Sequence, residues 1–271
     1  MIQDIAPHRL DNHFDPERRP EPEDRIISWN DGRMLIAEGE ELRFPRVAEA
    51  PEIPLQLLFL LDGTGYFLTD RELELPGYGY CGARELRRQE RAPQESMFAA
   101  FTAMHLAEWY RVTRFCGACG EALRPDPAER AMACPRCGEK VYPRINPAVI
   151  VGVTNGERLL LTRYRAGGSM NALVAGFTEI GETLEETVQR EVMEETGLRV
   201  RNIRYYKSQP WGIALDLLAG FFCEVVGDDT IRMDRTELKY AEWVPRRDIE
   251  LQPTNYSLTN EMMRLFRDGR V

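Results

Sequence analysis

Histidine, excess basic charge and long apolar runs are all scarce in this chain, and each shortage narrows its possible functions. The 271 residues include only three histidines, His8, His13 and His105, whose spacing matches no metal-binding pattern. Acidic residues outnumber basic ones by 44 to 35, and the net charge of −9 disfavours broad nucleic-acid binding. No apolar run approaches the roughly 18 residues of a membrane span, so we expect no membrane partner.

The start of the chain also lacks the basic and then apolar pattern of a signal peptide, so we expect a reducing, cytoplasmic location. Cysteine is sparse as well, but four of the six cysteines form two CxxC pairs separated by fourteen residues. Two such pairs predict a closed, structural zinc site of four thiolates. The predicted zinc ligands are Cys116, Cys119, Cys134 and Cys137.

Disulfides, a redox CxxC and free buried thiols are the competing interpretations of these cysteines. A reducing location disfavours disulfides, and the other two cysteines, Cys81 and Cys223, stand isolated in the sequence. A redox motif would not need a second copy. Zinc is therefore the favoured interpretation.

Acidic residues are abundant, and three of them fall at spacings that suit a helix. Glu191, Glu194 and Glu195 lie at positions i, i+3 and i+4, so their carboxylates project from one helical face. Like charges at this spacing destabilise a helix, and a divalent cation would compensate for them. Because Mg²⁺ and Mn²⁺ prefer hard oxygen ligands, the pattern predicts a site for one of these ions.

Local signals set both ends of this predicted helix. Thr183 and Glu186 have the spacing of a capping box, and Gly197 suits the left-handed residue that ends a helix. Arg190 directly precedes the acids and is expected to hold a carboxylate through two N–H groups. A solvated acidic surface is the competing interpretation, and it stays open for Glu185 and for Glu186.

From Gly176 to Leu198 the chain reads Gly, five residues, Glu, seven residues, Arg-Glu, an aliphatic residue, any residue, Glu-Glu, any residue, Gly and an aliphatic residue. This stretch resembles the Nudix box at every fixed position. The resemblance implies hydrolysis of a nucleoside diphosphate linked to another group, with a bound metal ion that activates water. The catalytic residues that it implies are Glu182, Arg190, Glu191, Glu194 and Glu195.

A second motif, Ser208-Gln209-Pro210-Trp211, closes the twelve residues that run from Val200 to Trp211, just after the box. Together with a zinc ribbon before the box, it resembles the NADH pyrophosphatase branch of the Nudix superfamily, also called NAD(+) diphosphatase. Those enzymes cut NAD(H) to nicotinamide mononucleotide and AMP, and some remove NAD caps from RNA. They are homodimers, so the resemblance implies a homodimer here.

The resemblance also assigns further residues to the site. Glu237 is implied to join Glu191, Glu194 and Glu195 around Mg²⁺ or Mn²⁺. Phe177 is implied to stack on a base, with Tyr142 of the other subunit as its partner. Core packing is the competing interpretation for Phe177 and Trp211. The implied substrate-binding residues are Tyr142, Ala175, Phe177, Ser208, Gln209, Trp211 and Glu237.

The chain departs from that branch after Trp211. The branch commonly shows Pro-Phe-Pro, any residue and Ser, whereas this chain has Gly212-Ile-Ala-Leu-Asp216. The loss of two prolines and an aromatic ring leaves broader dinucleotide substrates open, such as ADP-ribose and diadenosine polyphosphates. NAD-capped RNA also stays open, because residues 111–144 hold seven Arg or Lys against four acids. A non-catalytic sensing module is a further alternative, although the intact acid set disfavours it.

The pattern of strands and helices predicts an α+β protein in three parts. Residues 1–110 form an N-terminal α+β domain, 111–142 a zinc ribbon and 143–271 a Nudix α/β/α sandwich, the last by resemblance. Asn-Asp-Gly at 30–32, Asp-Gly at 62–63 and Asn-Gly at 155–156 predict hairpin turns. The first 24 residues, rich in Pro and charge, are expected to be irregular or partly disordered.

Overall fold

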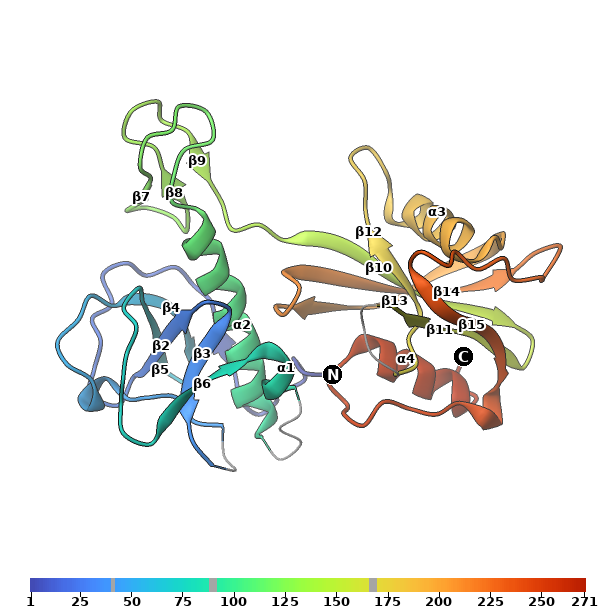
Figure 1. Cartoon of the computed structure of the whole chain (residues 1–271), viewed down its shortest axis with the longest axis horizontal. Coiled ribbons are helices and arrows are strands. Elements are labelled where there is room, and N and C mark those ends of the chain that lie inside the picture. Colours follow the sequence, from blue (N-terminus) through green and yellow to red (C-terminus); the bar gives the residue numbers. More distant parts are fainter. Residues whose placement is uncertain (40–41, 88–91, 166–169) are drawn as a thin grey trace. The chain divides into compact units, whose positions relative to one another are not determined.

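The computed structural model describes residues 1–39, 42–87, 92–165 and 170–271, which divide into two compact units (Figure 1). The N-terminal unit contains Ile2–Arg144 together with Gly212–Leu215. The C-terminal unit contains Ile145–Trp211 and Asp216–Val271, with Met1. Both units mix helices with sheets, which confirms the predicted α+β class. The three-part division of the chain stays a prediction.

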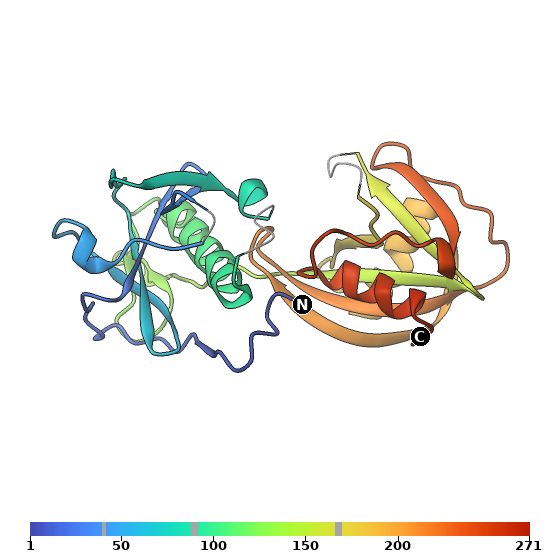
Figure 2. The same ribbon diagram turned by 90° about the horizontal axis from the view of Figure 1, so that it is seen from below.

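A six-stranded sheet forms the body of the N-terminal unit, with strand order β1-β4-β5-β2-β3-β6. The long helix α2, Gln94–Val112, lies against this sheet (Figures 1 and 2). The short elements of the unit are the helix α1, Ala83–Leu86, and the 3-10 helix η1, Val47–Glu49. The strands are β1 Leu10–Asp11, β2 Arg25–Asn30, β3 Arg33–Ala37, β4 Gln56–Leu61, β5 Thr64–Thr69 and β6 Tyr78–Gly82.

Both hairpin turns predicted in this unit are confirmed. Asp31 and Gly32 join β2 to β3 with positive φ angles of 46° and 74°, and Asp62 and Gly63 join β4 to β5 with 51° and 83°. Positive φ at both central residues is the requirement of the tight turn that suits strand twist. Asp and Gly meet this requirement at low cost, so these turns follow from local sequence.

Apart from β1, the first 24 residues are irregular, as expected, but the alternative that they are partly disordered is wrong. Ile2 and Ile5 are buried, and β1 pairs with β4. The buried Asp24 carboxylate accepts hydrogen bonds from the backbone N–H groups of Gly65 and Glu21. The composition of the segment did not predict this order, because two apolar side chains and one carboxylate anchor a segment that is otherwise polar.

The ribbon consists of three short antiparallel strands, β7 Arg124–Pro125, β8 Met132–Ala133 and β9 Lys140–Val141. Gly120 and Gly138 each follow a CxxC pair, with φ angles of 74° and 79°, a conformation that favours glycine. Two of the cysteines, Cys116 and Cys134, pack in a small core with Trp109, Leu123 and Met132. The ribbon therefore adds its own small core beside the thiols.

The C-terminal unit is built on one mixed sheet in the order β13-β14-β10-β11-β15, with β12 paired to β10. Helix α3, Leu184–Thr196, covers one face and helix α4, Leu258–Arg267, covers the other (Figure 1). A 3-10 helix, η2, spans Arg246–Asp248. The strands are β10 Asn146–Asn155, β11 Arg158–Tyr164, β12 Val174–Phe177, β13 Val200–Trp211, β14 Asp216–Val225 and β15 Leu238–Pro245.

Alternation along the central strand β10 places two cores on the two faces of this sheet. Val149 and Val151 pack in the core that includes Val188 of α3, whereas Ala148 and Ile150 pack in the core below α4. Successive strand residues point to opposite faces, and both faces are apolar here. The expected α/β/α sandwich is confirmed.

Candidate active site

Helix α3 begins and ends where local signals place it. The Thr183 hydroxyl accepts a hydrogen bond from the Glu186 backbone N–H at 3.2 Å, and the Thr183 N–H donates to the Glu186 carboxylate at 2.8 Å. These two bonds form the predicted capping box. Gly197 closes the helix with a φ of 70°. Because both ends are fixed, the acids between them keep a defined orientation.

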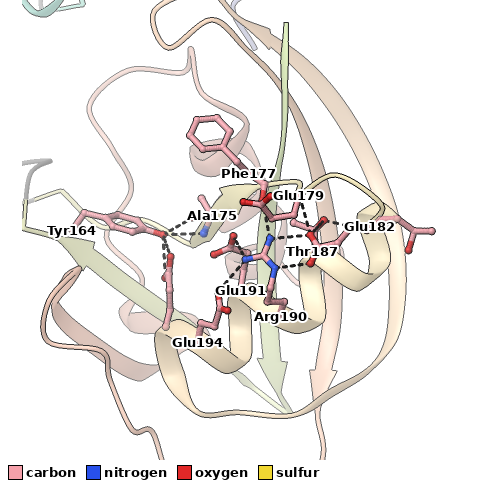
Figure 3. Close-up of polar contacts among 11 residues, drawn as sticks. Tyr164, Ala175, Phe177, Glu179, Glu182, Thr187, Arg190, Glu191 and Glu194 are labelled. Atoms are coloured by element: carbon pink, nitrogen blue, oxygen red, sulfur yellow. Dashed lines mark hydrogen bonds and ion pairs between the residues drawn. The ribbon is translucent and has the colours of Figure 1, made fainter.

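Arg190 lies at the centre of the acidic cluster (Figure 3). It holds Glu182 through two bonds, of 2.6 Å and 2.9 Å, and reaches Glu191 at 2.7 Å and Glu194 at 3.0 Å. It also donates to the backbone carbonyl of Phe177 at 2.8 Å. The Arg190 hydrogen bonds lower the pKa of Glu182 to about 2. One guanidinium thus offsets much of the repulsion among three carboxylates and ties α3 to β12.

Glu195 has a different environment from the other acids of the helix. It is only 2% exposed, and burial raises the pKa of its carboxyl to about 8, helped by the nearby charges of Glu191 and Glu237. The Tyr164 hydroxyl lies 2.8 Å and 3.1 Å from its two oxygens. Within the part of the chain that the structure describes, the cation Arg190 contacts the other acids but not this one.

Glu191 lies directly over Gly176 of β12. An ideal Cβ on Gly176 would come within 2.0 Å of the Glu191 carboxyl carbon, so only glycine leaves room for this carboxylate. Burial raises the pKa of Glu191, and Arg190 opposes that effect. The glycine that opens the box therefore makes space for one of its acids.

Glu237 lies in the exposed segment before β15, and its charge contributes to the raised pKa values of Glu191 and Glu195. Its backbone carbonyl accepts a hydrogen bond from the Arg165 N–H at 2.9 Å. The four acids offer hard carboxylate oxygens, and the buried Glu195 needs a compensating charge, so the set fits Mg²⁺ or Mn²⁺. Among the described residues, however, the four cysteines are the potential ligands gathered within 4.8 Å of one another, and the acids are more widely spread.

The four cysteine sulfurs have the spacing of a zinc site. Sγ–Sγ distances are 3.6 Å for Cys116–Cys137, 3.5 Å for Cys119–Cys134 and 3.6 Å for Cys119–Cys137. A tetrahedron with the usual zinc–sulfur bond has edges of about 3.8 Å. All four corners come from protein, so the set fits a closed structural zinc.

The expected substrate-binding residues lie in different environments. Phe177 is 55% exposed, so core packing is not its role, and its ring points away from the polar cluster in Figure 3. Tyr142 is 54% exposed and donates to Glu129 at 3.1 Å. Trp211 packs partly against the core below α4. The Ala175 backbone N–H donates a hydrogen bond to the Tyr164 hydroxyl at 2.8 Å.

Ser208 and Gln209 are adjacent on β13, and their side chains point to opposite faces of the sheet. Ser208 pairs with Ala219, on the α3 face, and is half-buried. Gln209 is fully buried; its amide donates to the Tyr256 carbonyl and accepts from the Leu258 N–H, both at 2.7 Å. The Gln209 side chain therefore holds the start of α4.

Two polar residues of this region carry no signal that single-sequence reasoning detects. Tyr164 contacts a glutamate that is 31 residues away in the chain. Asp216, within the segment that departs from the expected motif, is only 6% exposed, and burial raises its pKa to about 6. The side-chain amide of Asn146 contacts it at 3.5 Å. Both environments depend on strand pairing, which the local sequence does not specify.

Comparison with known proteins agrees with this architecture. Residues 144–266 match the family described as NUDIX domain, and residues 111–142 match the NADH pyrophosphatase zinc ribbon domain. The chain is 42% identical over 151 residues to a protein of Enterobacter sp. (strain 638) named NAD-capped RNA hydrolase NudC. It is 43% identical over 153 residues to the protein of the same name from Klebsiella pneumoniae subsp. pneumoniae. Each match covers 55% of this chain and 58% of the relative, so the chain spans little more than half the length of these relatives.

A solved structure supports the fold independently. The crystal structure of a NUDIX hydrolase from Nitrosomonas europaea superposes with a TM-score of 0.50 at 21% identity, covering 58% of this chain and 92% of that one. None of the helices in the described ranges is both long and apolar enough to cross a membrane. The chain thus carries a NUDIX domain directly preceded by an NADH pyrophosphatase zinc ribbon domain.

Proposed function

We propose that this protein is a metal-dependent diphosphatase that cleaves the pyrophosphate bond of NAD(H) to nicotinamide mononucleotide and AMP. The observation that carries the proposal is the complete acid set of α3 and the loop before it, in which Arg190 orders three carboxylates and Glu195 stays buried beside them. The zinc ribbon before the NUDIX domain and the relatives named NAD-capped RNA hydrolase support the same class of substrate.

In this proposal each group has a separate task. Glu191, Glu194, Glu195 and Glu237 would hold Mg²⁺ or Mn²⁺, and the ion would supply positive charge for the diphosphate oxygens and activation of water. Glu182 fixes Arg190, which orients the ligand carboxylates. The exposed ring of Phe177 offers a flat surface for a base. Ala175 lies on β12 with Phe177, whereas Ser208 and Trp211 lie on β13.

The proposed enzyme is a homodimer in which Tyr142 of the partner subunit completes the base-stacking site. Its exposure in one chain supports this role, because an aromatic ring at an interface starts out solvent-exposed. A cytoplasmic location suits four reduced cysteines. Sedimentation should give twice the mass of one chain, and a monomer that remains fully active would contradict the assembly.

Product analysis tests the proposed reaction. Incubation with NADH and Mn²⁺ should yield reduced nicotinamide mononucleotide and AMP on a chromatography column. Glu195→Gln should lower turnover at least about 100-fold, because it removes a carboxylate from the metal set. Glu185→Gln is the matched control, since Glu185 is exposed on the same helix outside the fixed positions. Intact NADH after incubation with well-folded protein would refute the proposal, and turnover of any nucleoside diphosphate derivative would exclude a purely sensing role.

NAD-capped RNA is the second candidate substrate, favoured by the names of the relatives and by the basic residues around the ribbon. Rates on capped RNA and on free NADH should be compared at two salt concentrations. If the RNA body is recognised, only the capped-RNA rate should fall steeply as salt rises, because phosphate contacts release counterions. A preference for free NADH at low salt would count against this candidate.

The Gly212–Asp216 segment favours a wider range of substrates than NAD(H) alone. A panel of NADH, NAD⁺, ADP-ribose and diadenosine polyphosphates, read by mass spectrometry, measures that range. Comparable rates across the panel would support a broad dinucleotide pyrophosphatase. Strict selectivity for NAD(H) would show that the missing prolines and aromatic ring are not needed for recognition.

A further inference from the structure

Tyr164, the last residue of β11, is placed where three segments of the candidate site meet. A register shift in the β11–β15 pairing occurs between Arg163 and Tyr164. From this position the Tyr164 hydroxyl reaches Glu195 of α3 and the backbone of Ala175 in β12 (Figure 3). The next residue, Arg165, donates its N–H to the carbonyl of Glu237. One short stretch of chain therefore contacts α3, β12 and the Glu237 segment.

The hydrogen-bond geometry gives the hydroxyl a definite direction. It accepts a bond from the Ala175 N–H at 2.8 Å, and its single proton then points to the Glu195 carboxylate, 2.8 Å and 3.1 Å away. The Leu173 and Ala175 carbonyls lie farther away, at 3.4 Å and 3.3 Å. The phenol is therefore a donor to Glu195 that a backbone bond holds in place.

The Glu195 carboxylate has this neutral hydroxyl as a donor, whereas the neighbouring acids have a charged one. Its carboxylate is almost completely buried, and a buried carboxylate needs hydrogen-bond donors to keep its charge and its orientation. Arg190 supplies charged donors to Glu182, Glu191 and Glu194 instead. The backbone of Glu195 is also fixed, because its carbonyl accepts from the Asp234 N–H at 2.8 Å. The Tyr164 hydroxyl, with the Ala175 backbone N–H beside it, then orients the Glu195 side chain.

We infer that Tyr164 is a positioning residue for divalent-cation binding, which holds the Glu195 carboxylate in the orientation that a metal ligand needs. The inference rests on the proposed function in that Glu195 is taken as a ligand of Mg²⁺ or Mn²⁺. It does not depend on which dinucleotide is cleaved. Partners that orient metal ligands typically contribute about 10- to 100-fold in metal affinity or activity.

The test is a titration of the full-length zinc-loaded protein with Mn²⁺ in the absence of nucleotide. Binding is measured from the electron paramagnetic resonance signal of the free Mn²⁺. Tyr164→Phe keeps the ring and removes only the hydroxyl, so Mn²⁺ affinity should fall about 10-fold or more. Tyr206→Phe is the matched control, because the Tyr206 hydroxyl lies 2.7 Å from Glu261 in the α4 region. This control should bind Mn²⁺ as the unmodified protein does.

Kinetics provide a second readout. At low Mn²⁺ the turnover of Tyr164→Phe should fall, and excess Mn²⁺ should restore it with the KM for the dinucleotide unchanged. If Tyr164→Phe does not fold, 4-aminophenylalanine at position 164 keeps an N–H donor and should preserve Mn²⁺ affinity. A change in affinity of less than fivefold in the folded Phe variant would overturn the inference, as would the absence of Mn²⁺ binding by the unmodified protein. Normal Mn²⁺ binding without NADH hydrolysis would instead refute only the proposed function.

Discussion

At the scale of single residues, the arrangement of the acids depends on the space and the charges around each carboxylate. Arg190 draws three of them together, whereas Glu195 is held by neutral donors. Gly176 matters for a different reason, because the Glu191 carboxyl occupies the place of a side chain on that residue. Acids of the same type on one helix therefore have different environments.

Gly176→Ala tests the importance of that space. The added methyl group would lie about where the Glu191 carboxyl is now, so the carboxylate must move while the helix stays in place. We expect turnover to fall at least about 10-fold, with a loss of unfolding free energy below about 2 kcal/mol, because the displaced group is the end of a flexible side chain. Steady-state kinetics and thermal unfolding measure the two effects. Equal turnover in the two proteins would show that the position of Glu191 is not critical.

The raised pKa of Asp216 predicts that the stability of the fold depends on pH. Burial raises its pKa from 3.8 to about 6, so the folded protein binds more protons than the unfolded chain between these values. The stability that Asp216 contributes is therefore fully present below pH 3.8 and is lost as the pH rises through about 6. Asp216→Asn removes the buried charge and should raise the unfolding free energy by about 1–2 kcal/mol at pH 8.

The gain from Asp216→Asn should shrink as the pH falls towards 5. Thermal unfolding midpoints at pH 5 and pH 8 give the comparison, with the exposed Asp248→Asn as a matched control. A gain of the same size at both pH values would mean that it comes from packing rather than from ionisation.

At the scale of secondary structure elements, the ends of helices and the turns of hairpins follow local sequence. The capping box at Thr183, the stop at Gly197 and the turn at Asp31–Gly32 are all found where the residues predict them. Each depends on φ angles or on bonds within four residues, which explains why sequence alone suffices. The order of strands in the sheets depends on distant pairings, and the sandwich was predicted by resemblance to a family rather than from periodicity.

Thr183→Ala removes the side-chain bonds at the start of α3. We expect a loss of about 1 kcal/mol in unfolding free energy, the usual contribution of a helix cap. Turnover should fall with it, since the first turn of α3, which contains Glu186, leads into Glu191, Glu194 and Glu195. Chemical denaturation compares this variant with Gln189→Ala, an exposed position on the same helix. Equal stability of the two variants would indicate that packing against the sheet alone fixes the helix start.

At the scale of the whole molecule, the contacts that sequence reasoning missed join distant segments. Tyr164 meets Glu195 because β11 and β12 end beside α3, and Gln209 meets Leu258 because β13 passes under α4. Neither the periodicity of the sequence nor the spacing of its motifs predicts contacts between such distant residues. The acids and the cysteines were predictable as sets because metal chemistry limits residue type and spacing, whereas the residues that orient them are limited only by the fold.

The two predicted metal sites should respond differently to chelators. Carboxylates on an accessible helix exchange a divalent cation readily, whereas four thiolates in a closed site retain zinc. EDTA should therefore abolish hydrolysis while about one zinc per chain remains by elemental analysis, and added Mn²⁺ should restore the rate.

Cys134→Ser provides the complementary variant, because its sulfur lies 3.5 Å from that of Cys119 within the small ribbon core. It should lose zinc and lower the thermal midpoint of unfolding, since metal binding and folding of such a small module are coupled. Added Mn²⁺ should not reverse either effect. If the variant instead lost its zinc yet unfolded at the same temperature, the ribbon would owe its stability to Trp109, Leu123 and Met132 rather than to the metal.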